Sequence, residues 1–332
     1  MKKQTRQVGE LALIESIRRE FAGRRSSVVR LGIGDDCAIL RPPAGCEILI
    51  TTDFSLEGRH FRRDWHSPES IGHRCLARGL SDLAAMGATP MAAFLSLALP
   101  LELRGTWTRR FLHGFRALAD VHAVPLAGGD TAQSPAEMVV ADIVLVGAAP
   151  AGRALRRSGA RAGDLLYVSG ALGGAAAELE RMRTGKVRLI RTGSSKQHPQ
   201  MFPEPRLAAG QSLLRKGLAT ACIDLSDGLS TDLAHLCLAS GVGAEVDAAR
   251  LPIHGLAAGL PNEEALRLAL DGGEDYELLF TAPATMKMPR RIAGVAITAV
   301  GRIVSRRKGL TLTGDDGTRK PLRPGGWEHF KS

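Results

Sequence analysis

The residues best suited to chemistry are aspartates in five short segments, each of which also contains glycine, serine or threonine. Every segment lies beside the end of an expected strand or helix: residues 32–36 (GIGDD), 51–53 (TTD), 81–82 (SD), 128–131 (GGDT) and 224–228 (DLSDG). Carboxylate, hydroxyl and backbone carbonyl oxygens are the hard ligands that Mg²⁺ prefers. An ordinary turn or helix cap is the commoner explanation for any one segment. Five such segments in one chain favour a shared magnesium site.

These carboxylates also predict the kind of ligand that the magnesium site would hold. Several carboxylates directed at one place repel one another unless cations lie between them. A polyphosphate bridged by Mg²⁺ is their natural complement, with glycine amides close to the phosphates. The sequence has no P-loop, no protein-kinase catalytic loop and no Gly-x-Gly-x-x-Gly turn. We therefore expect a less common nucleotide site that depends on metal ions. Arg153, Arg156 and Arg157 are either phosphate contacts or a solvated basic connector.

Two further segments and one histidine are candidates for ligand contacts. Residues 272–280 (GGEDYELLF) place three acids directly before an expected strand. Trp327 lies in a glycine-rich tail, where its ring could stack on a cationic or aromatic ligand. His60, within the segment EGRHF, fits either a ligand contact or a structural role.

Composition and charge narrow the class of protein. The chain has 332 residues, of which 44% are hydrophobic and 23% charged, as in globular proteins of two domains. Its formal net charge of +10 would suit a nucleic-acid-binding protein. The excess of positive charge, however, lies in residues 1–30, 181–216 and 286–332, whereas the segments with acidic motifs are net negative. Aromatic residues make up only 4% of the chain. Nucleic-acid binding is therefore the less favoured alternative.

Cysteine usage and the absence of targeting patterns predict a cytoplasmic protein. The five cysteines are scattered and form no Cys-x-x-Cys pair, which is typical of a reducing compartment. The basic N-terminus is followed by no apolar stretch, so we expect no signal peptide. Residues 83–101 are uncharged, but Gly87, Pro90 and Pro100 interrupt them. This pattern predicts a helix end, a turn and a strand, and no membrane span.

Two α/β domains are expected to position these segments, with a boundary in a connector rich in glycine and arginine near residues 150–163. The predicted domains are 1–150 and 151–332. Hydrophobic periodicity and turn residues predict helices at 9–23, 67–86 and 106–122 and strands at 28–31, 37–40, 47–52, 91–99 and 138–148. In the second domain they predict a strand at 164–169, a helix after 173–174, alternating elements over 222–280 and strands at 296–304 and 310–312. The basic residues 181–200 are expected to form a mobile loop.

Nine motifs, taken in order, resemble the thiamine-monophosphate kinase family over almost the whole chain. They are GELALIE, LGIGDDCAIL, TTDFSLEGRHF, LSDLAAMGATP, GGDT, GRALRRSGARAGD, IDLSDGLSTDL, GGEDYELLF and GWEHF. The resemblance implies the two-domain α/β (α+β) fold of aminoimidazole ribonucleotide synthetase, with N-terminal domains that pair in a homodimer. It also implies in-line phosphoryl transfer from ATP to thiamine monophosphate with several Mg²⁺ ions and no phosphoenzyme. Residues 1–150 would bind ATP and Mg²⁺ and dimerise, and residues 151–332 would complete the active site.

Carried over residue by residue, the resemblance implies a complete set of site residues. The implied Mg²⁺ ligands are Asp36, Thr51, Thr52, Asp53, Asp82, Asp130, Asp224 and Asp227. The implied ATP contacts are Gly129, Asp130, Arg157 and Ser226. The implied contacts to thiamine monophosphate are His60, Glu274 and Trp327. Asp53, Asp130 and Asp227 would be the catalytic carboxylates.

The chain departs from the family pattern at a few positions. Gly79 stands where the family commonly has asparagine, and Gly174 replaces a usual aspartate. Ala132 and Gln133 stand where it commonly has Thr-Arg, so one arginine contact to phosphate or substrate is lost. None of these changes removes an expected metal ligand. The alternatives are another ATP-using member of the superfamily and a homologue that binds the ligands but turns over weakly.

Overall fold

The computed structural model describes residues 10–21, 26–328 and 330, and the chain forms two compact units. Unit 1 comprises residues 1–80, 90–148 and 187–193, and unit 2 comprises residues 81–89, 149–186 and 194–332. Both units combine helices with β-sheet, which confirms the expected α/β class.

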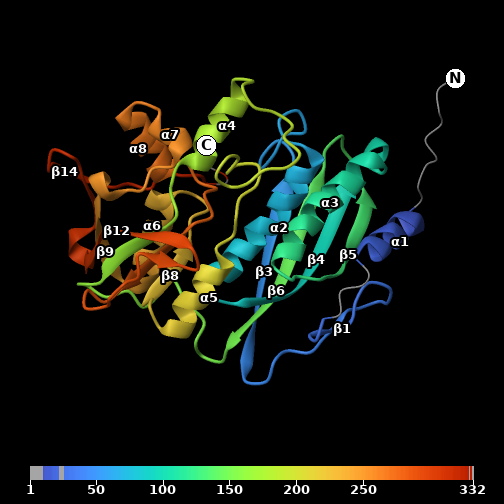
Figure 1. The fold of residues 1–332 in the computed structure, drawn as a ribbon, viewed down its shortest axis with the longest axis horizontal. Helices are drawn as coiled ribbons and strands as arrows, with labels where there is room; N and C mark the ends of the chain where they lie inside the picture. Colours follow the sequence, from blue (N-terminus) through green and yellow to red (C-terminus); the bar gives the residue numbers. More distant parts are fainter. Residues whose placement is uncertain (1–9, 22–25, 329, 331–332) are drawn as a thin grey trace. The chain divides into compact units, whose positions relative to one another are not determined.

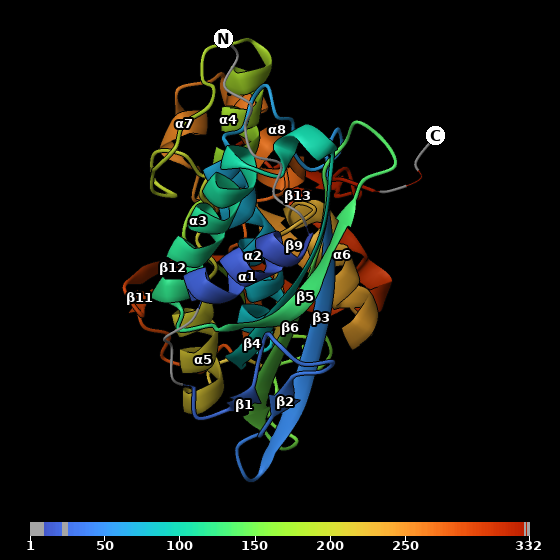
Figure 2. The ribbon, with the colours of Figure 1, turned by 90° about the vertical axis from the view of Figure 1, so that its right-hand side faces the viewer.

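Unit 1 is built on a four-stranded sheet of order β3-β6-β4-β5, in which β4 and β5 are parallel. Helices α2 and α3 lie along one face of this sheet (Figures 1 and 2). A separate antiparallel ribbon is formed by β1 and β2. The elements of this part of the chain are α1 (Glu10–Phe21), β1 (Val29–Leu31), β2 (Ile39–Leu40), β3 (Cys46–Leu56), α2 (Pro68–Ala85), β4 (Thr89–Leu99), a 3-10 turn (Leu101–Leu103), α3 (Thr106–Val121), β5 (Leu126–Gln133) and β6 (Val140–Pro150).

Three of the five acidic segments are not the turns that the sequence suggested. Residues 51–53 lie inside β3, residues 81–82 lie inside α2, and residues 128–131 lie inside β5. The pair Gly128-Gly129 indicated a turn, but here glycine permits a close approach between neighbouring strands. A Cβ atom on Gly129 would lie 1.9 Å from the carbonyl oxygen of Leu95 in β4. Only residues 32–36 and 224–228 form the expected turns.

Gly79 has a packing reason for its departure from the family pattern. This residue of α2 faces β6, and a Cβ atom there would lie 2.8 Å from Cδ1 of Leu145. Both Leu145 and the neighbouring Ile143 are fully buried. The helix therefore lies directly against two aliphatic side chains of the sheet, and a larger residue at position 79 would displace them.

Unit 2 is built on a larger, mostly antiparallel sheet of order β14-β13-β9-β12-β7-β10-β8, with β11 paired to β12. Among the strand pairs of the described residues in this sheet, only β13 and β9 run parallel. Its core includes Leu166, Ile223, Leu233 and Val300, all nearly inaccessible to solvent. The elements are β7 (Leu165–Ser169), α4 (Gly174–Arg183), α5 (Leu207–Lys216), β8 (Ala221–Asp224), α6 (Leu229–Ser240), β9 (Val242–Asp247), a 3-10 turn (Ala248–Arg250), α7 (Gly255–Ala258), α8 (Asn262–Asp271), β10 (Leu278–Ala282), β11 (Arg291–Ile292), β12 (Val295–Ser305), a 3-10 turn (Arg306–Lys308), β13 (Leu310–Thr313) and β14 (Arg319–Pro321).

The basic residues 181–200 do not form one detached loop. Residues 187–193 belong to unit 1, where the amide of Leu189 donates to the carbonyl of Trp65 at 2.9 Å. Gln200, at the end of the segment, is only 2% exposed. The expectation of a mobile loop is therefore wrong for its anchored C-terminal end. Among the described residues, no helix combines the length and apolar character that crossing a membrane requires.

Candidate functional site

Asp53 lies on the face of β3 that the helices cover, where Arg78 of α2 holds its carboxylate. Nη2 and Nε of Arg78 donate to Oδ1 of Asp53 at 2.7 and 3.2 Å. Side chains alternate along a strand, so Thr51 shares this face and Thr52 does not. Oγ1 of Thr52 instead donates to Oδ1 of Asp142 at 2.9 Å. The structure therefore brings Thr51 and Asp53 together and directs the Thr52 side chain to the opposite face.

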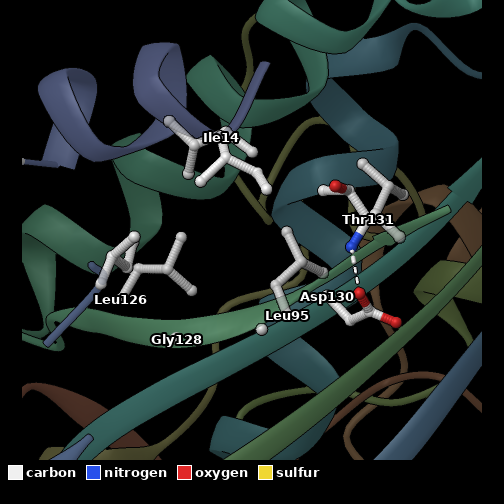
Figure 3. A pocket seen from close by; sticks show the side chains of 10 residues that line it. Ile14, Leu95, Leu126, Gly128, Asp130 and Thr131 are labelled. Atoms are coloured by element: carbon white, nitrogen blue, oxygen red, sulfur yellow. Dashed lines mark hydrogen bonds between the residues drawn. The ribbon is translucent and has the colours of Figure 1, made fainter. Parts of the chain in front are cut away.

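A small apolar cavity connects two of the acidic segments in unit 1. It has a volume of about 90 Å³ and lies between α1 and strands β4 and β5 (Figure 3). Ile14 and Leu95 form part of its apolar wall, and residues 128–131 form its polar end. Ile33, from the first acidic segment, also lines it. Asp130 is exposed at this end, and its Oδ1 accepts a hydrogen bond of 2.8 Å from the amide of Thr131.

The remaining unit 1 candidates, Asp36 and His60, lie on two different loops. Asp36 is exposed, and its amide donates to Oδ1 of Asp35 at 2.9 Å. His60 is half-buried, and its Nδ1 accepts a hydrogen bond of 2.9 Å from the amide of Leu56. Because Nδ1 acts as the acceptor, the neutral ring carries its proton on Nε2. The local backbone thus fixes both the orientation and the tautomer of this imidazole.

In unit 2, three segments that are far apart in the sequence meet at Ser226 and Asp227. The amide of Glu274 donates to the carbonyl of Ser226 at 2.8 Å. The amide of Trp327 donates to the carbonyl of Asp227 at 3.0 Å. A Cβ atom on Gly326 would lie 2.0 Å from the same carbonyl oxygen, so only glycine permits this approach. The indole of Trp327 is 50% exposed beside this turn and does not belong to the core.

Carboxylates crowd together at the carboxyl end of β8. Asp224 is 4% exposed, and its Oδ2 accepts a hydrogen bond of 2.7 Å from Oγ of Ser81. Oδ2 of Asp232 accepts hydrogen bonds of 3.1 Å from the amides of Asp227 and Gly228. Burial, and then the charges of Asp224 and Asp227, raise the pKa of Asp232 to about 8. The three acids are thus close enough for their charges to repel.

Asp232, Asp142 and Arg78 were missed by the sequence reasoning. Asp232 lies within the motif IDLSDGLSTDL, so its proximity to the other acids had a signal in the sequence. Asp142 and Arg78 had none, because their contacts depend on strand and helix pairing.

The last candidates, Asp82 and Arg157, also belong to unit 2. Asp82 follows Ser81 on α2 and is half-buried. Arg157 is exposed, and its carbonyl accepts a hydrogen bond of 2.9 Å from Oγ of Ser240. Within the part of the chain that the structure describes, no three His, Cys, Asp or Glu side chains are grouped as metal ligands are.

Family models and curated proteins match this chain over most of its length. Residues 34–149 match the family described as AIR synthase related protein, N-terminal domain, and residues 161–288 match the corresponding C-terminal domain. The thiamine-monophosphate kinase of Salmonella typhimurium is 40% identical over 97% of this chain and 98% of its own length. That of Bacillus subtilis is 32% identical over 92% and 95% of the two chains.

Solved structures extend this similarity to the fold. The thiamine-monophosphate kinase of Stenotrophomonas maltophilia is 37% identical, with a TM-score of 0.78 over 93% of this chain and 97% of that one. AaThiL complexed with AMPPCP and TMP is 31% identical, with a TM-score of 0.74 over 97% of both chains. The hydrogenase maturation protein HypE in complex with ATP shares the fold, with a TM-score of 0.75 at 18% identity. The two-domain fold expected from the sequence is confirmed.

Proposed function

The chain belongs to the thiamine-monophosphate kinase family, and on this premise we propose how its own residues carry out the ATP-dependent phosphorylation of thiamine monophosphate. The acceptor in this reaction is a phosphate oxygen that is already anionic near neutral pH, so no strong general base is needed. The main obstacle is to hold two polyanions in line. The observation that carries our assignment is the convergence of residues 224–227, Glu274 and Trp327 through backbone hydrogen bonds.

We assign Mg²⁺ as the metal because the donor set fits it. Asp224, Asp227 and Asp232 bring carboxylates within range of mutual repulsion, which a hard cation relieves. When bound, Mg²⁺ neutralises phosphate charge and orients the transferred group. The proposed ligands are Asp36, Thr51, Thr52, Asp53, Asp82, Asp130, Asp224 and Asp227. Thr52 would contribute its main-chain oxygen, since its side chain points to the opposite face of β3 from Thr51 and Asp53.

The substrate contacts follow from the placement of the other candidates. We assign thiamine monophosphate to Trp327, whose exposed indole can stack on a cationic ring, and to the carboxylate of Glu274, which can balance positive charge. His60 contributes an imidazole of fixed orientation. ATP is assigned to Gly129, Asp130, Arg157 and Ser226. Of these, Arg157 supplies a guanidinium suited to phosphate.

Product analysis tests this assignment. Incubation of the purified protein with ATP, Mg²⁺ and thiamine monophosphate is expected to give thiamine diphosphate and ADP in equal amounts. Asp53→Asn is expected to lower kcat/KM by at least about 100-fold, because it removes one charge that acts on the transferred phosphoryl group. The exposed Asp316→Asn is the matched control and should leave the rate unchanged. Normal turnover by Asp53→Asn would refute the metal assignment, and a chemically competent phosphorylated protein would refute direct transfer.

We also propose that the protein is a homodimer that pairs through β3. This strand is at the edge of the unit 1 sheet, and Ile48, Ile50 and Phe54 are 42%, 69% and 57% exposed on the face away from α2. A row of exposed apolar side chains of this kind marks an interaction surface.

A substitution in this row tests the homodimer. Ile50→Asp is expected to convert the dimer to a monomer, because a carboxylate would be buried without a partner. Light scattering after size-exclusion chromatography measures the change, with Val121→Asp, at an exposed position on α3, as the control. A wild-type monomer, or a dimeric Ile50→Asp variant, would exclude this interface.

A cytoplasmic location is the remaining proposal. The five cysteines are all free, and Cys75, Cys222 and Cys237 are buried. Free thiols are typical of proteins in a reducing compartment.

A further inference from the structure

We propose that Gln200 is a positioning residue that orients the carboxylate of Glu274 for binding of thiamine monophosphate. Nε2 of Gln200 donates to Oε2 of Glu274 at 2.6 Å. The two residues are 74 positions apart in the sequence, and Gln200 is only 2% exposed. The inference rests on the proposed role of Glu274 as a substrate contact and adds a residue that nothing in the sequence motifs indicates.

Gln200 is itself held in place by a buried acid of α4. Glu178 is 1% exposed, and its Oε2 accepts a hydrogen bond of 2.8 Å from the backbone amide of Gln200. Its Oε1 lies 2.7 Å from Nδ1 of His198, two residues earlier in the same segment. One buried carboxylate therefore fixes the backbone at Gln200 and the side chain at His198. The next two residues, Met201 and Phe202, are buried as well.

The backbone of Glu274 is fixed by the turn at Ser226. Its backbone has φ +57°, in the left-handed region that residues other than glycine seldom adopt, and its amide donates to the carbonyl of Ser226 at 2.8 Å. The backbone and the carboxylate of Glu274 are thus held by two separate parts of unit 2. A free glutamate samples many rotamers, and ordering it during binding lowers affinity. In this protein Gln200 supplies that order before the substrate arrives.

The direction of the hydrogen bond explains why an amide suits this position. An ionised carboxylate only accepts hydrogen bonds, so the NH₂ group of Gln200 must face Glu274. A hydrogen bond to a charged group is stronger than one between neutral groups. The amide stabilises the charged form of Glu274 without adding a second charge, and the carboxylate keeps its negative charge for a cationic substrate.

Steady-state kinetics of Gln200→Leu tests the proposal, since leucine keeps the volume and loses the amide. We expect the KM for thiamine monophosphate to rise by about 10-fold, with kcat within about twofold and the KM for ATP unchanged. Gln200→Asn, whose shorter amide does not reach Glu274, should show the same selective rise and serves if the leucine variant fails to fold. Gln197→Leu is the matched control, because Gln197 is exposed in the same segment and bonds only locally to Ser194.

A double-mutant cycle with Glu274→Gln distinguishes the positioning role of Gln200 from the proposed role of Glu274 as a substrate contact. We expect Glu274→Gln to raise the same KM and the double variant to add little, because Gln200 acts through Glu274. If Glu274→Gln leaves that KM unchanged, the substrate role of Glu274 fails and the present inference fails with it. If Glu274→Gln raises that KM but Gln200→Leu does not, or the two effects add fully, only the positioning role is overturned.

Discussion

Gly129→Ala is expected to destabilise the protein by about 2–5 kcal/mol, combining the cost of overpacking with that of a strained backbone. Gly129 has φ +148°, which L-residues rarely adopt, and an added Cβ would lie 1.9 Å from the carbonyl oxygen of Leu95. The two residues are paired in the parallel strands β4 and β5, so neither backbone can move aside without breaking the sheet. Because Asp130 follows directly, ATP binding should weaken as well.

Chemical denaturation of Gly129→Ala beside Gly45→Ala tests the steric part of this prediction. Gly45 also has a positive φ, +70°, but no atom lies within 4 Å of its added Cβ. The control should therefore show only the conformational cost of about 1–2 kcal/mol. Equal losses in the two variants would contradict the close approach of β4 and β5 at Gly129.

Glu277→Gln is expected to lower the free energy of unfolding by about 3–5 kcal/mol, because it removes the buried counter-charge of Arg206. The arginine would keep only the exposed carboxylate of Glu204, 2.9 Å from its Nη1. Glu277 is 3% exposed, and Nη2 and Nε of Arg206 donate to its two carboxylate oxygens at 2.6 and 2.7 Å. Burial alone lowers the pKa of Arg206, but the hydrogen bonds and charge of Glu277, followed by those of Glu204, outweigh it and raise that pKa. In the variant, the NH₂ group of the glutamine would face the N–H groups of the guanidinium. Both are donors, so no hydrogen bond can form between them.

Glu180→Gln provides the matched control for the buried pair. Glu180 accepts a hydrogen bond of 2.9 Å from Arg183 on α4, but the two side chains are 46% and 67% exposed. An exposed pair of this kind contributes at most about 1 kcal/mol to stability. The melting temperature of the Glu180→Gln variant should therefore differ little from that of the wild type. A loss below about 1 kcal/mol for Glu277→Gln would show that the exposed Glu204, together with water, is enough to compensate the charge of Arg206.

Local patterns were sufficient to predict most of the elements. The expected helices at 67–86 and 106–122 agree with α2 and α3, and the expected strand at 91–99 agrees with β4. Their apolar periodicity reflects the sheet and helix faces that are buried within one unit. Predictions from glycine and aspartate were less accurate, although both residues are typical of turns. Glycine is also used where backbones approach closely, and Asp53, Asp82 and Asp130 lie inside strands or a helix.

The Gly128–Gly129 pair and the short strands show this limit. Residues 128–131 were expected to form a turn, but they lie inside β5 and pair with residues 94–97 of β4. The strand β14 was not expected, since three exposed residues carry no periodic signal. In both cases the deciding contact is with a strand distant in the sequence.

The sequence by itself determined the class of the fold, the family and the chemical type of the site, because these depend on which residues are present and in what order. Only the tertiary structure decided which carboxylates share a location and which side chains hold them. Asp53 and Thr52 are neighbours in the chain but point to opposite faces of β3. Gln200 and Glu274 are distant in the chain but share a hydrogen bond. The physical reason is that side-chain direction alternates along a strand, while partners across a unit are brought together only when the core packs.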